Sequence, residues 1–166
     1  MDISDHLGQG ERVTRKARQL RTMIIVFIPL FTLQFWLGMS INLEINLPVE
    51  HFSAVESVIY FSSHFPMILA HILTGSLIVI LATVFLAVSL TSSTRSFAII
   101  GIIGMSAVIG ATVNGILFLM TGQFFGNSIG MAMSAVVALI TYLTVLYKTG
   151  LILGRKQLAS RLQTSD

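Results

Sequence analysis

The sequence contains no cysteine, and this absence excludes several kinds of chemistry at once. A chain without thiols forms no disulfide, no cysteine-ligated zinc site and no iron–sulfur cluster. Catalytic motifs are absent as well: there is no Walker sequence, no GxGxxG and no HExxH. The sequence therefore favours a non-catalytic protein over an enzyme.

Charge is also scarce, and it is unevenly placed. Only 10% of the residues are charged and 54% are hydrophobic, whereas a soluble domain carries about 25% charged residues. All seven acids and ten bases lie outside four long apolar runs, at about 23–43, 65–90, 97–120 and 128–146. Since roughly 20 apolar residues in a helix cross a bilayer, the sequence predicts an all-α, integral membrane, four-helix antiparallel bundle over residues 23–147.

The distribution of bases predicts the orientation of this bundle. The ten bases fall in a polar N-terminal segment (1–22), in a turn (91–96) and in a C-terminal tail (148–166). With four spans these three regions share one side, so the positive-inside rule places both termini in the cytoplasm of a cell-membrane protein. The expected partner of the bases is the lipid bilayer, and no aromatic platform accompanies them to indicate nucleic-acid binding.

The opposite side carries the longest connection, residues 44–63, with three acids and no base. Four apolar residues recur in it at helical spacing: Val49, Phe52, Val55 and Ile59. This spacing predicts a short helix that lies in the membrane interface with its apolar side down.

Small and polar residues share faces on three of the spans. These sets are Gln34, Gly38 and Asn42; Ser106, Gly110 and Asn114; and Gly126, Gly130 and Ser134. Such faces favour close helix contact, either within the chain or with a second copy or other membrane subunits. LQFWLGMSINL and IGATVNGILFL, on the first and third spans, are compatible with a 2+2 repeat of hairpins, which would place a site between the hairpins.

A histidine, His71, lies roughly 10 Å inside the second span, counting 1.5 Å per residue, where an ionisable side chain usually has a partner or a function. One histidine per helix suffices for haem, and Met131, Met133, Met39 or His71 of a second copy would supply the other axial ligand. His64 lies near the surface on nearly the same face, where it would hold a propionate or a second cofactor. The alternative is a neutral imidazole that hydrogen-bonds to Asn114, Ser134 or a backbone carbonyl.

LQFWLG in the first span, followed by AHILTG in the second, resembles the helix pair in one half of a haem A synthase, over about fifty residues. That family is built from two four-helix halves. The resemblance implies that Gln34 and Gly38 match the first helix of the pair, and that His71 is the haem ligand. The fourth span contains no histidine, so a bis-histidine site would be incomplete in a single chain.

Three function classes follow. The sequence favours a non-catalytic subunit or assembly partner of a membrane complex. The first alternative is a b-type haem protein for electron transfer or oxidase assembly, with His71, His64, Met131, Gln34 and Asn114 as candidate cofactor-binding residues and His71 on the iron. The second alternative is a transporter or channel for a small solute.

Overall fold

The computed structural model describes residues 3–45, 53–92 and 94–163, which form five helices and no strand. These helices are α1 (Ile3–Glu44), α2 (Ala54–His64), α3 (Pro66–Leu90), α4 (Arg95–Met120) and α5 (Phe125–Gln163). Four of them are long and apolar enough to cross a membrane, and at most 28% of their apolar windows is buried inside the protein. The all-α class and the four candidate spans are thus confirmed.

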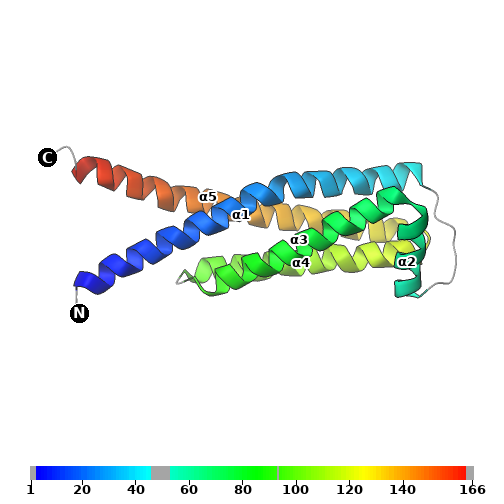
Figure 1. Cartoon of the computed structure of the whole chain (residues 1–166), viewed down its shortest axis with the longest axis horizontal. Coiled ribbons are helices and arrows are strands. Elements are labelled where there is room, and N and C mark those ends of the chain that lie inside the picture. Colours follow the sequence, from blue (N-terminus) through cyan, green and yellow to red (C-terminus); the bar gives the residue numbers. More distant parts are fainter. Residues whose placement is uncertain (1–2, 46–52, 93, 164–166) are drawn as a thin grey trace.

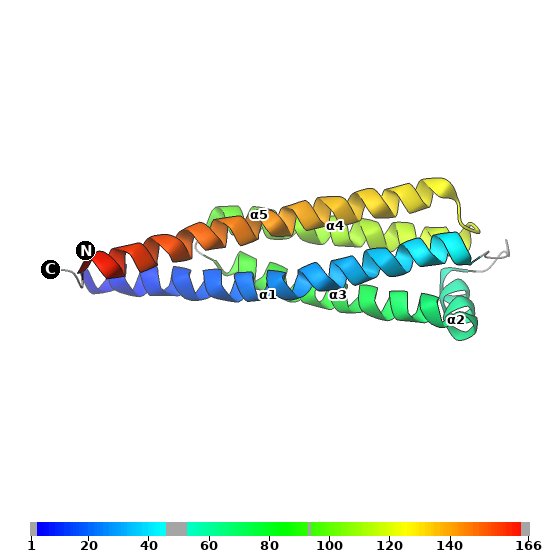
Figure 2. The same ribbon diagram turned by 90° about the horizontal axis from the view of Figure 1, so that it is seen from above.

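The four long helices pack as an antiparallel bundle in the cyclic order α1, α3, α4, α5 (Figures 1 and 2). The neighbours in contact are α1 with α3, α3 with α4, α4 with α5, and α5 with α1. The bundle can be divided into two hairpins, α1/α3 and α4/α5, and we call these two pairs the hairpins. We call the two ends of the bundle the terminal end, where Ile3 and Gln163 lie, and the α2 end (Figure 1).

Two of the helices extend well beyond the other two at the terminal end. α1 has 42 residues and α5 has 39, against 25 and 26 for α3 and α4. The basic part of the 1–22 segment therefore continues the first span without a break, and most of the basic tail continues the last. Pro29 lies inside α1.

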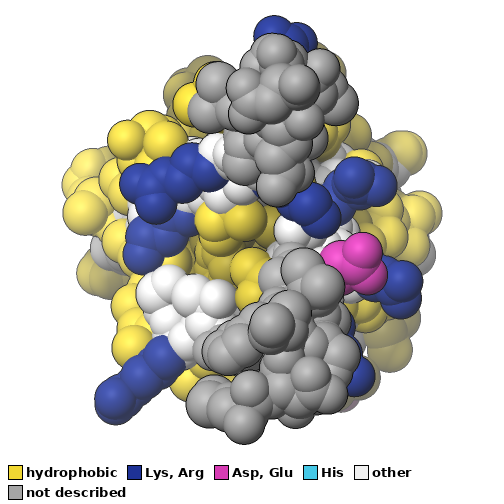
Figure 3. Space-filling view, turned by 90° about the vertical axis from the view of Figure 1, so that its left-hand side faces the viewer, with side chains coloured by type: hydrophobic (Ala, Val, Ile, Leu, Met, Phe, Trp, Pro, Cys, Tyr) yellow, Lys and Arg dark blue, Asp and Glu magenta, His cyan; other side chains and the backbone are white. Residues whose placement is uncertain are grey.

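Basic side chains surround the terminal end (Figure 3). One of them, Lys16 on α1, donates a hydrogen bond of 2.6 Å to Oγ1 of Thr91, at the carboxyl end of α3. This contact ties α1 to the turn between α3 and α4. It also places the lysine ammonium near the carboxyl end of α3, where a cation is favourable.

The core has two parts. The larger cluster fills the terminal half and centres on Tyr142. Its ring stacks on Phe27, with the ring centroids 4.5 Å apart, and meets Phe85 edge to face, with the centroids 5.0 Å apart. The smaller cluster lies at the α2 end and consists of Ile41, Phe61, Ile68 and Phe118.

The short helix α2 covers the α2 end and packs on α3 and α4 (Figure 2). It begins with a capping box in which Ser53 and Glu56 bond each other's backbone N–H groups. Its buried residues are Ser57 and Phe61, whereas Val55 and Ile59 are 68% and 63% exposed. The apolar row expected to anchor this helix thus faces away from the bundle, and Val49 and Phe52 of that row lie outside the described residues.

The small-residue faces meet within each hairpin. A Cβ on Gly110 would lie 3.1 Å from Ser134 Oγ, and a Cβ on Gly130 would lie 2.4 Å from Asn114 Oδ1. Each glycine of this α4/α5 pair therefore accommodates a polar side chain of the facing helix. Asn114 also donates a hydrogen bond of 2.8 Å to the carbonyl of Gly110 on its own helix.

Candidate functional site

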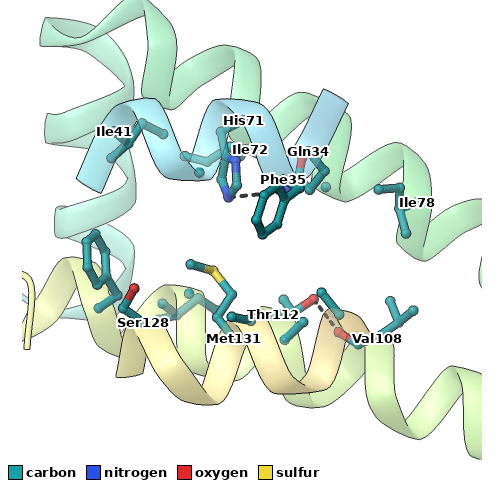
Figure 4. Close-up of a pocket in the computed structure, with 18 of the residues that line it drawn as sticks. Gln34, Phe35, Ile41, His71, Ile72, Ile78, Val108, Thr112, Ser128 and Met131 are labelled. Carbon is teal, nitrogen blue, oxygen red and sulfur yellow. Dashed lines mark hydrogen bonds between the residues drawn. The ribbon is translucent and has the colours of Figure 1, made fainter. Parts of the chain in front are cut away.

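A cavity of about 400 Å³ lies between the two hairpins, in the half of the bundle nearer α2 (Figure 4). Residues of all five helices line it. Its walls are mostly apolar, and the polar groups among them include Gln34, Asn42, His71, Ser76, Thr112 and Ser128. Cavities of roughly 300–1,000 Å³ with few polar groups are typical of small-molecule sites.

His71 and Gln34 form the polar centre of one wall (Figure 4). The carboxamide nitrogen of Gln34 donates a hydrogen bond to Nε2 of His71 over 3.0 Å. Because a neutral imidazole carries one proton, this bond leaves the proton on Nδ1. Nδ1 of His71 and Oε1 of Gln34 are buried and have no hydrogen-bond partner.

Two glycines make room for this pair. A Cβ on Gly38 would lie 3.1 Å from Cε1 of His71, and a Cβ on Gly75 would lie 3.0 Å from the carboxamide nitrogen of Gln34. Each helix of the hairpin therefore presents one polar residue and, four positions later, one glycine. Since residues i and i+4 share a helix face, the two antiparallel helices interlock side chain against glycine.

The structure answers the question of which group pairs with His71. The partner is Gln34, not Asn114, Ser134 or a backbone carbonyl. The reason is the hairpin: α1 packs directly against α3, whereas the Asn114 amide bonds its own helix and its side chain packs on Gly130 of α5.

The predicted candidate residues separate into two groups. His71, Gln34, Met131 and Met39 all line the cavity. The side chains of His71 and Met131 enter it from opposite hairpins, from α3 and α5 (Figure 4). Asn114 is not among the lining residues, and Met133 is 60% exposed on the outside of α5.

His64 lies apart from the cavity, at the last residue of α2. Its ring stacks on Tyr60 at 4.3 Å, and its Nδ1 lies 2.8 Å from the Tyr60 carbonyl, to which it donates. The geometry therefore does not bring His64 and His71 to one ligand.

Most of the lining residues were not singled out from the sequence, among them Gly75, Phe35 and Val58. Gly75 carried a readable signal, because it follows His71 by four positions as Gly38 follows Gln34. Phe35 and Val58 carried none, since an apolar residue in an apolar run looks alike whether it faces lipid or a cavity.

Among the described residues, no group of three or more His, Asp and Glu side chains is placed to hold a metal ion. Haem is a different case, because it needs only axial ligands, and imidazole and thioether are both suitable. Among the lining residues, His71 carries an imidazole, and Met39 and Met131 carry thioethers. To bind iron, Nε2 of His71 would first have to leave the Gln34 carboxamide.

The comparisons with protein families, curated proteins and solved structures give no match.

Proposed function

We propose that this is an integral protein of the cell membrane, with both termini in the cytoplasm, that binds one small and mostly apolar molecule between its two hairpins. In this role it acts by binding, as a non-catalytic subunit or assembly partner of a membrane complex. The cavity around His71 and Gln34 is the observation that carries the proposal.

The size of the cavity is the first argument. A volume of about 400 Å³ lies within the range of sites that hold small molecules, and the residues around an unfilled space lose packing contacts. A bundle that keeps such a volume open gains most if a molecule fills it.

The polar pair is the second argument. His71 and Gln34 satisfy each other only in part, and two of their polar atoms keep no partner. Burying polar atoms in this way costs free energy, so a bundle selected only for packing would favour apolar residues here. The pair supports binding of a molecule that has a polar group within an apolar body.

The test is to identify what the purified protein carries. Organic extraction of the protein from detergent, followed by mass spectrometry, should recover one molecule in stoichiometric amount. Ala135→Phe, which fills the cavity from α5, should abolish the recovery. Val137→Phe is the matched control, because Val137 is exposed on the same helix and is not among the lining residues. Equal recovery from both variants would refute the proposal.

Haem b is the second candidate for the ligand, favoured by the imidazole of His71 and the thioether of Met131 on facing hairpins. The purified protein would then be coloured and would show a reduced-minus-oxidised α-band. The band should vanish in His71→Ala and shift in Met131→Leu. A colourless protein that still yields another molecule on extraction would remove haem and keep the binding function.

A further inference from the structure

Both ends of the cavity are closed. The α2 end is closed by the cluster of Ile41, Phe61, Ile68 and Phe118, and each of these residues is at most 4% exposed. Gln123, in the turn between α4 and α5, adds a hydrogen bond to the carbonyl of Ile45 at the end of α1. At the other end, the stacked rings of Phe27 and Tyr142 close the path toward the terminal end.

One side is more open. Phe35 and Met39 on α1 line the cavity, yet they are 58% and 46% exposed. Ala132 on α5 also lines the cavity and is exposed. A side chain that touches the cavity and the surroundings at once marks an opening, so the gap between α1 and α5 is an entrance.

The residues at this entrance differ in size on its two sides. Phe35, Met39 and Asn42 follow one another at i, i+4 and i+7 on α1, and Ser128, Ala132 and Ala135 do so on α5. Each set therefore shares one helix face. Phe35 and Met39 on α1 are large, whereas all three residues of the α5 set are small, which leaves space between the helices.

The opposite side of the bundle, between α3 and α4, is covered near its end. α2 packs on both of these helices, and its Val58 reaches the cavity lining. Ser76 and Thr112 are the exposed lining residues on that side. By the same criterion these two residues mark an opening on this side as well, but they carry hydroxyls, whereas Phe35, Met39 and Ala132 give the α1/α5 opening an apolar border.

The entrance lies at a depth where the helices carry no charged residue, so it faces hydrocarbon rather than water when the helices span a bilayer. We propose that the ligand is a membrane-dissolved amphiphile with a hydrocarbon chain, which enters sideways between α1 and α5 past Phe35 and Met39. This inference rests on the proposed binding function. It adds the class of ligand and its route.

The test uses a phosphatidylcholine that carries a diazirine in the middle of one acyl chain, in nanodiscs that contain the full-length protein. The informative adducts are on Ile78 and Val108, which line the cavity but are only 3% and 4% exposed. Light should attach the probe to these two residues, because a chain that stays outside the bundle cannot reach them.

Three variants locate the route. Ala132→Trp should narrow the entrance and abolish the adducts on Ile78 and Val108, whereas Val136→Trp, exposed on the same helix and outside the lining, should leave them unchanged. Phe35→Ala should widen the entrance and speed their formation, which keeps the test decisive if the tryptophan variant fails to fold.

Two results would overturn the inference. The first is unchanged labelling in both Ala132→Trp and Phe35→Ala; loss of labelling in Ser76→Trp would then place the route on the α3/α4 side. The second is no labelling of Ile78 and Val108 in a protein from which a ligand is extracted, which would leave the binding function standing. Labelling of the cavity without any recoverable ligand would instead count against the proposed function.

Discussion

At the scale of single residues, the hairpins depend on glycines that face polar side chains. Gly38 faces His71 and Gly75 faces Gln34 in the first hairpin; Gly110 faces Ser134 and Gly130 faces Asn114 in the second. Small residues allow helix backbones to approach closely in lipid, where no hydrophobic driving force brings helices together. The order along the helix differs between the hairpins: the polar residue precedes the glycine by four positions in the first and follows it by four in the second.

The tightest of these contacts gives the first prediction. Gly130→Ala places a Cβ 2.4 Å from Oδ1 and 2.8 Å from Cγ of Asn114, so the side chain or the helix must move. Overpacking of this kind should lower the free energy of unfolding by about 1–3 kcal/mol. The midpoint of thermal unfolding in detergent should fall accordingly.

Gly154→Ala is the matched control, because nothing lies within 4 Å of the added Cβ on α5. Replacing an exposed helical glycine should stabilise the helix by roughly 0.5–1 kcal/mol. A Gly130→Ala protein as stable as Gly154→Ala would contradict the proposed close contact.

The second prediction concerns the bond between Gln34 and His71. Gln34→Met should destabilise the protein by about 1–3 kcal/mol, because it leaves Nε2 of His71 buried without a partner. Adding His71→Leu to that variant should recover part of the loss. The measurement is a double-mutant cycle of unfolding free energies, and simple additivity of the two changes would show that the bond contributes nothing.

At the scale of elements, α2 is the helix whose end is best defined by its own sequence. The Glu56 carboxylate accepts two hydrogen bonds from Ser53: one from Oγ at 2.7 Å and one from the Ser53 backbone N–H at 2.9 Å. These two bonds favour the ionised carboxylate and hold the pKa of Glu56 below its ordinary value. The cap therefore depends on pH.

The third prediction follows from the sign of that shift. Because the folded pKa of Glu56 is lowered, the cap stabilises α2 at pH values above the ordinary carboxyl pKa, and this contribution is lost as the pH falls through the folded pKa. An NMR titration of the carboxyl should show a midpoint below 4.5. In Ser53→Ala, which removes the hydroxyl donor, the midpoint should rise; an unchanged midpoint would exclude the hydroxyl bond as a cause.

At the scale of the whole molecule, the two hairpins pack closely in the terminal half and separate in the α2 half. The cause is side-chain size. Tyr142 and three phenylalanines fill the space on the terminal side. Alanines and glycines of α4 and α5 face the centre nearer α2, and the cavity with His71 lies among them.

The fourth prediction tests the orientation of the whole bundle. Since the chain has no cysteine, one introduced cysteine reports one position. A membrane-impermeant maleimide should label Ser63→Cys on α2 in intact cells. It should label Glu11→Cys, among the bases of α1, only after the cells are permeabilised. The reverse pattern would invert the proposed topology.

The sequence by itself determined the helical class, the four apolar helices and the small-residue faces, because these depend on the composition and spacing of neighbours along one helix. Spacing also identified Gln34 and Gly38, and the isolated histidine in an apolar run identified His71. The length of α1 and α5 beyond the bundle was not predicted, because polar residues form a helix or a coil with nearly equal ease.

Only the tertiary structure decided which of these residues meet. Gln34 rather than Asn114 pairs with His71, Met131 shares the cavity with them, and His64 does not, because these outcomes depend on which helices are neighbours and on their rotation. Sequence periodicity gives the face of a helix but not what that face contacts. The cavity is a property of four helices at once, and its apolar walls are indistinguishable in sequence from the apolar surface that faces outward.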